Sequence, residues 1–145
     1  CPRSRESVRE PPRTEEHAID TLVTLTQLLL VAAMIDVWIL RYDKPLRARG
    51  GDAQTMVEEF RVYGLPDWFR VLTRVLKLGS AALIAIGIWY PVSALAGGSL
   101  LAVLMAGAVA MHIKVKDAWF KAVPASFFLG LSLFVAYAHR SALPA

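Results

Sequence analysis

Residues 92–113 read VSALAGGSLLAVLMAGAVAMHI, and this stretch decides the fold because it contains no Asp, Glu, Lys or Arg. A helix rises about 1.5 Å per residue, so about 20 residues cross the ~30 Å hydrocarbon core of a bilayer. Further apolar stretches of similar length occupy residues 21–40, 69–90 and 122–138. The sequence therefore predicts an all-α, polytopic membrane protein, built as an antiparallel bundle of four transmembrane helices.

The tryptophans support this division of the chain. They lie at or near the ends of the apolar stretches, at Trp38, Trp68, Trp89 and Trp119. Amphipathic aromatic rings favour the headgroup layer of a bilayer. Their positions therefore mark where the membrane surfaces are expected.

Composition narrows the functional classes. The chain is 56% hydrophobic with a net charge of +4, and basic loops of membrane proteins face anionic lipid, so nucleic acid is not an expected partner. Cys1 is the only cysteine, which excludes an internal disulfide and a cysteine-ligated metal. His112 is expected at one membrane face and His17 and His139 at the other, so two histidines do not converge on a haem. No catalytic residue or metal site is predicted.

The domain organisation follows from the same pattern. Residues 1–18 are charged, contain prolines and have almost no large apolar side chain, which predicts a flexible tail. The first helix is expected to begin near residues 19–21, with Asp20 or Thr21 as its cap. The membrane domain then covers residues 19–140, and residues 141–145 form a short C-terminal tail.

The connection between the first two stretches carries its own helix pattern. Gly50-Gly51 breaks the chain, and Thr55 with Glu58 three positions later fits a capping box. Gly64 and Pro66 then provide a stop. The residues that would share one face are Met56, Phe60 and Tyr63. A short amphipathic helix on the membrane surface is predicted here, with Glu58 and Glu59 in solvent.

Loop lengths and charges predict the topology. Residues 89–91 are the whole link between the second and third stretches, which requires a tight antiparallel hairpin. Nine Lys and Arg lie in or beside loops 41–68 and 114–121, against five near the termini. The positive-inside rule then places both loops in the cytoplasm and both termini outside.

Small residues recur at every fourth position of the third stretch. Such a ridge lets another helix backbone approach closely, which matters in lipid because the hydrophobic effect does not drive helix association there. The predicted packing residues of this stretch are Ala94, Gly98, Ala102, Ala106 and Ala110, and the same spacing in the fourth stretch selects Ser126 and Gly130. They are expected to serve folding, with a membrane protein partner or a second copy of the chain as the alternative.

Ionisable residues inside the stretches form the strongest functional pattern. Asp36, His112 and the i, i+4, i+7 stripe Arg70, Arg74 and Lys77 are all expected in the leaflet on the loop side. An unpaired charge there costs about 3 kcal/mol or more, so Asp36 is expected to pair with Arg74 or Lys77. These charges either neutralise one another or form a pocket for a quinone-like head group or a lipid phosphate.

Two segments resemble the DoxX-like family of small four-helix membrane proteins. They are YGLPDWFRVLTRVLKLGSAALIAIGIWYP at 63–91 and LMAGAVAMHIKVKDAWFKAVPA at 104–125. The matching positions include Leu65-Pro66, Lys77-Leu78, Gly107-Ala108, His112 and Asp117. The resemblance implies the four-helix fold and a bacterial plasma membrane location, whereas residues 34–38 depart from the family pattern.

The resemblance also bears on function, since relatives include quinone-linked oxidoreductase subunits and receptor assembly chaperones. The first expectation is an accessory subunit of membrane redox or quinone chemistry, without enzymatic activity of its own. Its ligand site would contain Asp36, Arg74, Lys77, His112 and Asp117, with quinone as the candidate ligand. The alternative is a non-catalytic scaffold or assembly chaperone for a partner membrane protein.

Overall fold

A computed structural model describes residues 13–143, and every regular element within them is helical. The five α-helices are α1 (Arg13–Ile35), α2 (Met56–Val62), α3 (Asp67–Ile86), α4 (Pro91–Lys114) and α5 (Trp119–Ala138). A π-helical turn (Asp36–Leu40) extends α1, and a 3₁₀ turn (Arg140–Ala142) follows α5. The predicted all-α class is confirmed.

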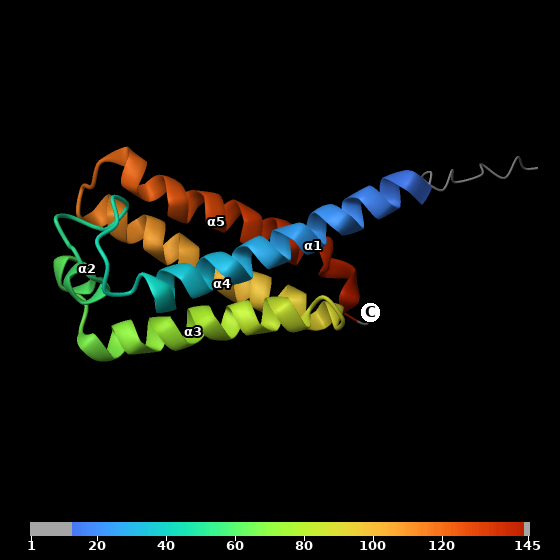
Figure 1. Cartoon of the computed structure of the whole chain (residues 1–145), viewed down its shortest axis with the longest axis horizontal. Coiled ribbons are helices and arrows are strands. Elements are labelled where there is room, and N and C mark those ends of the chain that lie inside the picture. Colours follow the sequence, from blue (N-terminus) through green and yellow to red (C-terminus); the bar gives the residue numbers. More distant parts are fainter. Residues whose placement is uncertain (1–12, 144–145) are drawn as a thin grey trace, which may run out of the picture.

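The four long helices pack as a bundle (Figure 1). α4 packs against α3 on one side and α5 on the other, and α1 contacts both α3 and α5. α1 and α4 therefore lie diagonally across the bundle. The short turn before Pro91 makes α3 and α4 an antiparallel hairpin, as predicted. α2 and the loops that flank it gather at one end of the bundle, away from the C-terminus (Figure 1).

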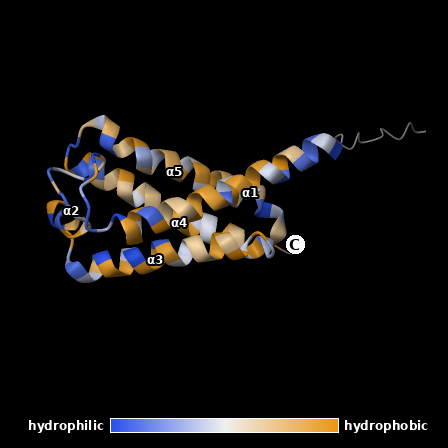
Figure 2. Cartoon of the chain, viewed as in Figure 1, coloured by the Kyte–Doolittle hydropathy of each residue, from blue (hydrophilic) through white to orange (hydrophobic). Residues whose placement is uncertain are grey.

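Three helices are long and apolar enough to cross a membrane. They are Arg13–Leu40, Pro91–Lys114 and Trp119–Ala142. The predicted span at residues 69–90 is not among them, because the first half of α3 carries Asp67, Arg70, Arg74 and Lys77. Figure 2 shows hydrophilic residues at the end of α3 next to α2.

The first helix begins earlier than predicted. α1 begins at Arg13, so the predicted tail at residues 1–18 is wrong for its last part, while residues 1–12 lie outside the described residues. Two glutamates in the first turn favour this start, because they interact well with the positive end of the helix dipole. Asp20 and Thr21 lie inside the helix, and the Thr21 hydroxyl donates to the His17 carbonyl (2.7 Å).

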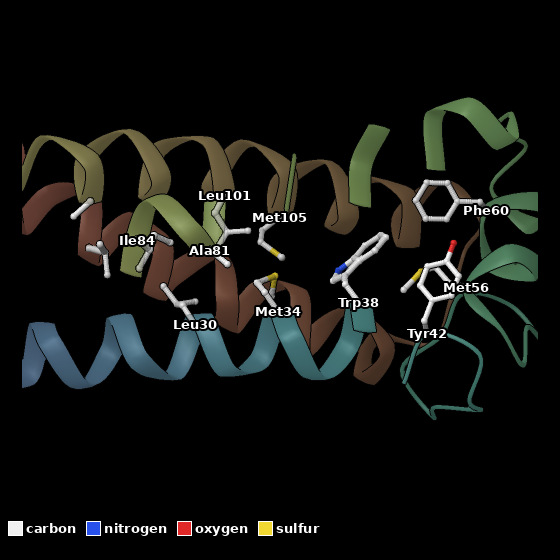
Figure 3. Packing of buried hydrophobic residues seen from close by; sticks show 12 residues of the cluster. Leu30, Met34, Trp38, Tyr42, Met56, Phe60, Ala81, Ile84, Leu101 and Met105 are labelled. Carbon is white, nitrogen blue, oxygen red and sulfur yellow. The ribbon is translucent and has the colours of Figure 1, made fainter. Parts of the chain in front are cut away.

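The π-helical turn keeps one face of α1 directed into the bundle. The buried residues of this face are Leu30, Met34, Trp38 and Tyr42. On an α-helix each i+4 step drifts by about 40°, so four such residues would spiral off a flat face. The wider turn, closed by the Arg41 N–H bonding to the Asp36 carbonyl (2.8 Å), counters that drift. Figure 3 shows Trp38 pointing inward beyond Met34.

Glycines set how closely α4 approaches its neighbours. A Cβ on Gly97 would lie 2.8 Å from the Ser80 carbonyl oxygen of α3. A Cβ on Gly98 would lie 3.0 Å from the backbone nitrogen of Ala136 in α5. Gly98 therefore serves packing within the chain. Gly97, which the fourfold spacing did not select, makes the closer approach.

Only part of the predicted small-residue ridge is buried. Ala94, Gly98 and Ala102 are buried, as predicted, whereas the remaining members are exposed: Ala106, Ala110, Ser126 and Gly130. The drift of about 40° per i+4 step explains the exposure of Ala106 and Ala110, because over several steps the ridge of α4 turns away from the face on which it began. The prediction that these last four residues pack within the bundle is wrong.

The short helix predicted in the long loop is present as α2. The Thr55 hydroxyl caps it by accepting from the Glu58 N–H (3.3 Å), and the Glu58 carboxylate accepts from the Gln54 N–H (2.6 Å). Met56, Phe60 and Tyr63 are all buried. The amphipathic face that the spacing indicated thus covers the end of the bundle.

Candidate functional site

A cavity of about 400 Å³ lies between α2 and the four long helices. Most of its wall is apolar, and the larger apolar side chains there are Met34, Trp38, Phe60, Met105, Met111 and Phe128. The polar and ionisable side chains on the wall are Arg49, Glu59, Tyr63, Thr73, Lys77, His112 and Lys121. Figure 3 shows the Trp38 ring between the Met34–Met105 pair and the Phe60–Tyr42 group.

The end of α4 brings His112 and Asp117 together. Lys116 has a left-handed backbone (φ 54°), which lets the Asp117 N–H reach back to the His112 carbonyl (3.0 Å). The chain therefore folds over its own last turn, and His112 Nδ1 lies 2.7 Å from Asp117 Oδ2. Both side chains are buried. The carboxylate orients the imidazole so that its other nitrogen faces Tyr63.

The second oxygen of Asp117 ties two loops together. Oδ1 accepts from the Gly51 N–H (2.9 Å), and Lys121 Nζ lies 3.8 Å away while also donating to the Gly51 carbonyl. Gly51 has φ +55°, a conformation in which a side chain is strained. Burial raises the pKa of Asp117, but the bonds from His112 and Gly51 and the nearby cations outweigh burial. The net pKa lies below the usual 3.8, so this carboxylate is ionised.

Tyr63 continues the polar chain on the other side of His112. Its hydroxyl lies 3.4 Å from His112 Nε2 and donates to Glu59 Oε1 (2.8 Å). Burial, reinforced by the Glu59 carboxylate, raises the pKa of Tyr63 far above its usual value, so the phenol stays protonated. A Cβ on Gly50 would lie 2.4 Å from the Tyr63 ring, so a side chain at this position would require the ring to shift.

Arg49 is the last member of this series of polar contacts, and it also bonds to the loop before α2. Its guanidinium is buried and lies 3.1 Å from Glu59 Oε2. It also donates to three backbone carbonyls of the same loop, those of Arg41, Tyr42 and Lys44. The prediction that Glu59 is solvated is therefore wrong. Its partner comes from an irregular loop, for which the sequence offered no pattern.

The three cations of α3 face aromatic rings. Lys77 Nζ lies 4.7 Å from the centroid of the Trp38 ring, and the Arg74 guanidinium lies 4.5 Å from that of Tyr42. Arg70 donates to the Tyr42 hydroxyl. Such cation–π contacts stabilise a buried cation without neutralising it.

Asp36 does not join this cluster. It pairs with Arg41 (3.0 Å), and both side chains are substantially exposed. The π-helical turn explains this pairing, because it places residue 41 over residue 36. The predicted pair of Asp36 with Arg74 or Lys77 is therefore wrong, and Asp36 is absent from the cavity wall.

The structure thus places the predicted site residues in different surroundings. Lys77 and His112 line the cavity, and Asp117 contacts His112 from behind. Arg74 lies over the Tyr42 ring and is absent from the cavity lining. Sequence reasoning missed Arg49, Glu59 and Tyr63 as site residues. Within residues 13–143, no three His, Cys, Asp or Glu side chains converge on a possible metal position.

The regular elements of residues 13–143 are all helical, and three of the helices are long and apolar enough to cross a bilayer, which is typical of an α-helical membrane protein. The model of the DoxX-like family matches residues 48–135, which is more than half of the chain. The protein belongs to the DoxX-like family. The matched region contains the whole polar chain from Arg49 to Asp117 as well as Lys77, whereas Trp38 lies before it.

One relative comes from Bacillus subtilis (strain 168), where it bears the name Uncharacterized protein YdgD. It is 34% identical over 80 residues, which cover 54% of this chain and 70% of that protein. No solved structure matches the chain. As expected of a membrane protein, large apolar side chains on the outside of the bundle, such as Leu25 and Leu133, are exposed.

Proposed function

We propose that this protein binds a small ring compound of the quinone class in the cavity beneath α2, as an accessory subunit of membrane redox chemistry. The observation that carries the proposal is the composition of the cavity wall. Ligand sites of this kind are mostly apolar, with a few polar groups that fix orientation. Here aromatic and methionine side chains form the wall, and Lys77 and His112 provide the polar groups.

The dimensions and side chains suit such a ligand. About 400 Å³ lies within the range of small-molecule sites. The Trp38 and Phe60 rings both line the cavity and meet edge-to-face with centroids 6.3 Å apart, which provides aromatic surface for a ring compound. A quinone carbonyl would accept from Lys77 Nζ, whereas His112, whose Nδ1 contacts Asp117 and whose Nε2 faces Tyr63, adds polarity to the same wall. No redox step by the protein itself is part of this proposal.

The proposal includes a membrane placement with four spans. α3 would be the fourth span, and the contacts of its cations within the protein support this: Lys77 lies over Trp38 and Arg74 over Tyr42. Its outward side chains are apolar and exposed, among them Val71, Leu72, Val75 and Ile86. The excess of Lys and Arg in loops 41–68 and 114–121 favours their cytoplasmic location in a bacterial plasma membrane. α2 would then lie at the cytoplasmic surface.

Quenching of Trp38 fluorescence tests the proposal. Trp38 lines the cavity and is buried, whereas the other three tryptophans, Trp68, Trp89 and Trp119, are exposed and can be replaced by Phe. Titration of this single-tryptophan protein in detergent with menadione should give saturable quenching. It should also raise the melting temperature, because a ligand that binds only the folded state stabilises it.

A cavity-filling variant is the matched control. Ala108→Phe places a ring in the cavity wall and should abolish saturable quenching while the helical circular dichroism is unchanged. Linear, unsaturable quenching in the parent protein, equal to that of Ala108→Phe, would remove the proposed function.

A scaffold role is the second candidate, and the exposed part of the small-residue ridge favours it. Ala106, Ala110, Ser126 and Gly130 all face outward, where they would admit the backbone of a partner helix. Gly130→Leu should then abolish co-purification of a partner in mild detergent, and Ala108→Phe should leave it intact. The opposite pattern would favour the ligand-binding role.

A further inference from the structure

The geometry points to an anionic head group on the ligand of this cavity, with Lys77 as the residue that selects it; the inference rests on the proposed function. Lys77 lines the cavity and is 7% exposed. Within residues 13–143 its ammonium group forms no hydrogen bond and no ion pair, and it lies 4.7 Å from the centroid of the Trp38 ring. A buried cation therefore borders an apolar cavity without a counterion.

The carboxylates near the cavity are engaged elsewhere. Glu59 Oε2 accepts from Arg49 (3.1 Å), and Glu59 Oε1 accepts from the Gly50 N–H (2.9 Å) and the Tyr63 hydroxyl (2.8 Å). Both Glu59 oxygens therefore already have donors, and the carboxylate forms no ion pair with Lys77.

The second carboxylate is equally committed. Asp117 holds His112 through one oxygen, and its other oxygen accepts from Gly51 and faces Lys121. Asp36, the acid that the sequence suggested for Lys77, pairs with Arg41 outside the cavity. The positive charge of Lys77 is thus the one cavity charge that the described protein residues leave without a partner.

An ionised oxygen on the ligand would supply that partner. Charge-assisted hydrogen bonds are shorter and stronger than neutral ones, and an apolar wall strengthens them further. A neutral carbonyl would accept a hydrogen bond from Lys77 but leave the charge uncompensated. The ligand class that fits is an acidic ring compound, such as a hydroxyquinone ionised at neutral pH, with its ring against Met34, Met105 and Phe128. Discrimination of about tenfold or more over a neutral analogue is expected.

Two ring compounds of nearly the same size test this inference. 2-Hydroxy-1,4-naphthoquinone is anionic at pH 7, and its methyl ether, 2-methoxy-1,4-naphthoquinone, is neutral. Dissociation constants are measured by Trp38 quenching in the single-tryptophan protein described above. The hydroxy compound should bind about tenfold more tightly than the ether. Lys77→Met should bring the two constants together mainly by weakening the hydroxy compound, and Lys77→Arg should keep the preference.

The outcomes separate this inference from the function on which it rests. The inference of an anionic head group would be overturned if the parent protein bound the two compounds equally, or if Lys77→Met kept the preference. Either result would still leave a ring-binding site. Failure of both compounds and of menadione to bind would remove the proposed function itself. Retained binding of the ether by Lys77→Met shows that this variant is folded.

Discussion

At the scale of single residues, one chain of polar contacts ties three separate segments together. It begins at Arg49 in the first loop, passes through Glu59 and Tyr63, and reaches His112 and Asp117 at the end of α4. Every member is buried or nearly so. Removing one member of such a network leaves its neighbours with unsatisfied buried groups, so single changes should be felt strongly.

Asp117→Asn tests the end of this chain. The amide should weaken the orientation of His112 and lower the stability of the detergent-solubilised protein at pH 7 by about 1–3 kcal/mol. Because the pKa of Asp117 is below the usual 3.8, the unfolded chain takes up this proton first as the pH falls. The contribution of the ionised carboxylate is therefore complete above about pH 4 and is lost as the pH falls through the lower folded pKa.

Melting temperatures between pH 7 and pH 3 check this expectation. The parent protein should lose stability at the acid end, and Asp117→Asn should lose less from its lower starting point. Asp43→Asn, in the exposed part of the first loop, is the control and should follow the parent. Identical acid profiles for the parent protein and Asp117→Asn would show that this carboxylate does not contribute as described.

At the scale of elements, α4 is the helix on which the bundle is assembled. It packs against both α3 and α5, and adjacent glycines serve the two contacts. The approach to α3 is the closer one, because a Cβ on Gly97 would meet backbone atoms of Ser80 and Ile84 within 3 Å. Backbone atoms of a packed helix cannot rotate away as a side chain can.

Gly97→Ala should therefore destabilise the protein more than Gly98→Ala. The Gly97 change forces α3 and α4 apart, at about 1–3 kcal/mol for overpacking. A Cβ on Gly98 has 3.0–3.1 Å to its nearest neighbours in α5, which a small shift accommodates. Gly79→Ala is the control, because nothing lies within 4 Å of its Cβ position. It should be neutral or stabilising, since alanine favours a helix by up to about 1 kcal/mol.

Unfolding midpoints in a denaturing detergent compare the three variants. The expected order of stability is Gly79→Ala, then Gly98→Ala, then Gly97→Ala. If Gly98→Ala were the least stable, the contact of α4 with α5 would be the tighter of the two.

At the scale of the whole molecule, polar and apolar residues are separated along the bundle axis. Figure 2 shows hydrophilic residues gathered around α2, the adjoining loops and the start of α3. The outer surfaces of the long helices are largely apolar. In a membrane, this arrangement would place the candidate site near one surface, under the basic loops.

Single-cysteine labelling checks the four-span topology. With Cys1→Ser removing the only native cysteine, one cysteine is introduced at a time in place of Asp43, Tyr90 or Ala118, all of which are exposed. A membrane-impermeant maleimide applied to intact spheroplasts should label the Tyr90 site. The Asp43 and Ala118 sites should react only after the membrane is opened.

The result also tests α3 by itself. If α3 did not cross the membrane, the Asp43 and Tyr90 sites would react from the same side. Labelling of Asp43 and Ala118 in intact spheroplasts, with Tyr90 protected, would instead reverse the predicted orientation.

The sequence by itself determined the class of protein and most of its helices. Apolar length is a local property, so residues 92–113 predicted α4 directly, and Thr55 with Glu58 located α2. The family segments identified Lys77 and His112, and both residues line the cavity. The start of α1 was missed because charged, polar residues also form a helix when their charges suit its dipole.

Only the tertiary structure decided which charges meet and where space is left. Because of the π-helical turn, Asp36 pairs with Arg41 instead of Lys77. Because Lys116 has a left-handed backbone, Asp117 contacts His112. Glu59 pairs with Arg49, which lies ten positions earlier in an irregular loop. These contacts depend on small backbone rotations and on segments distant in the chain, whereas periodicity reports only the direction of a side chain within its own helix.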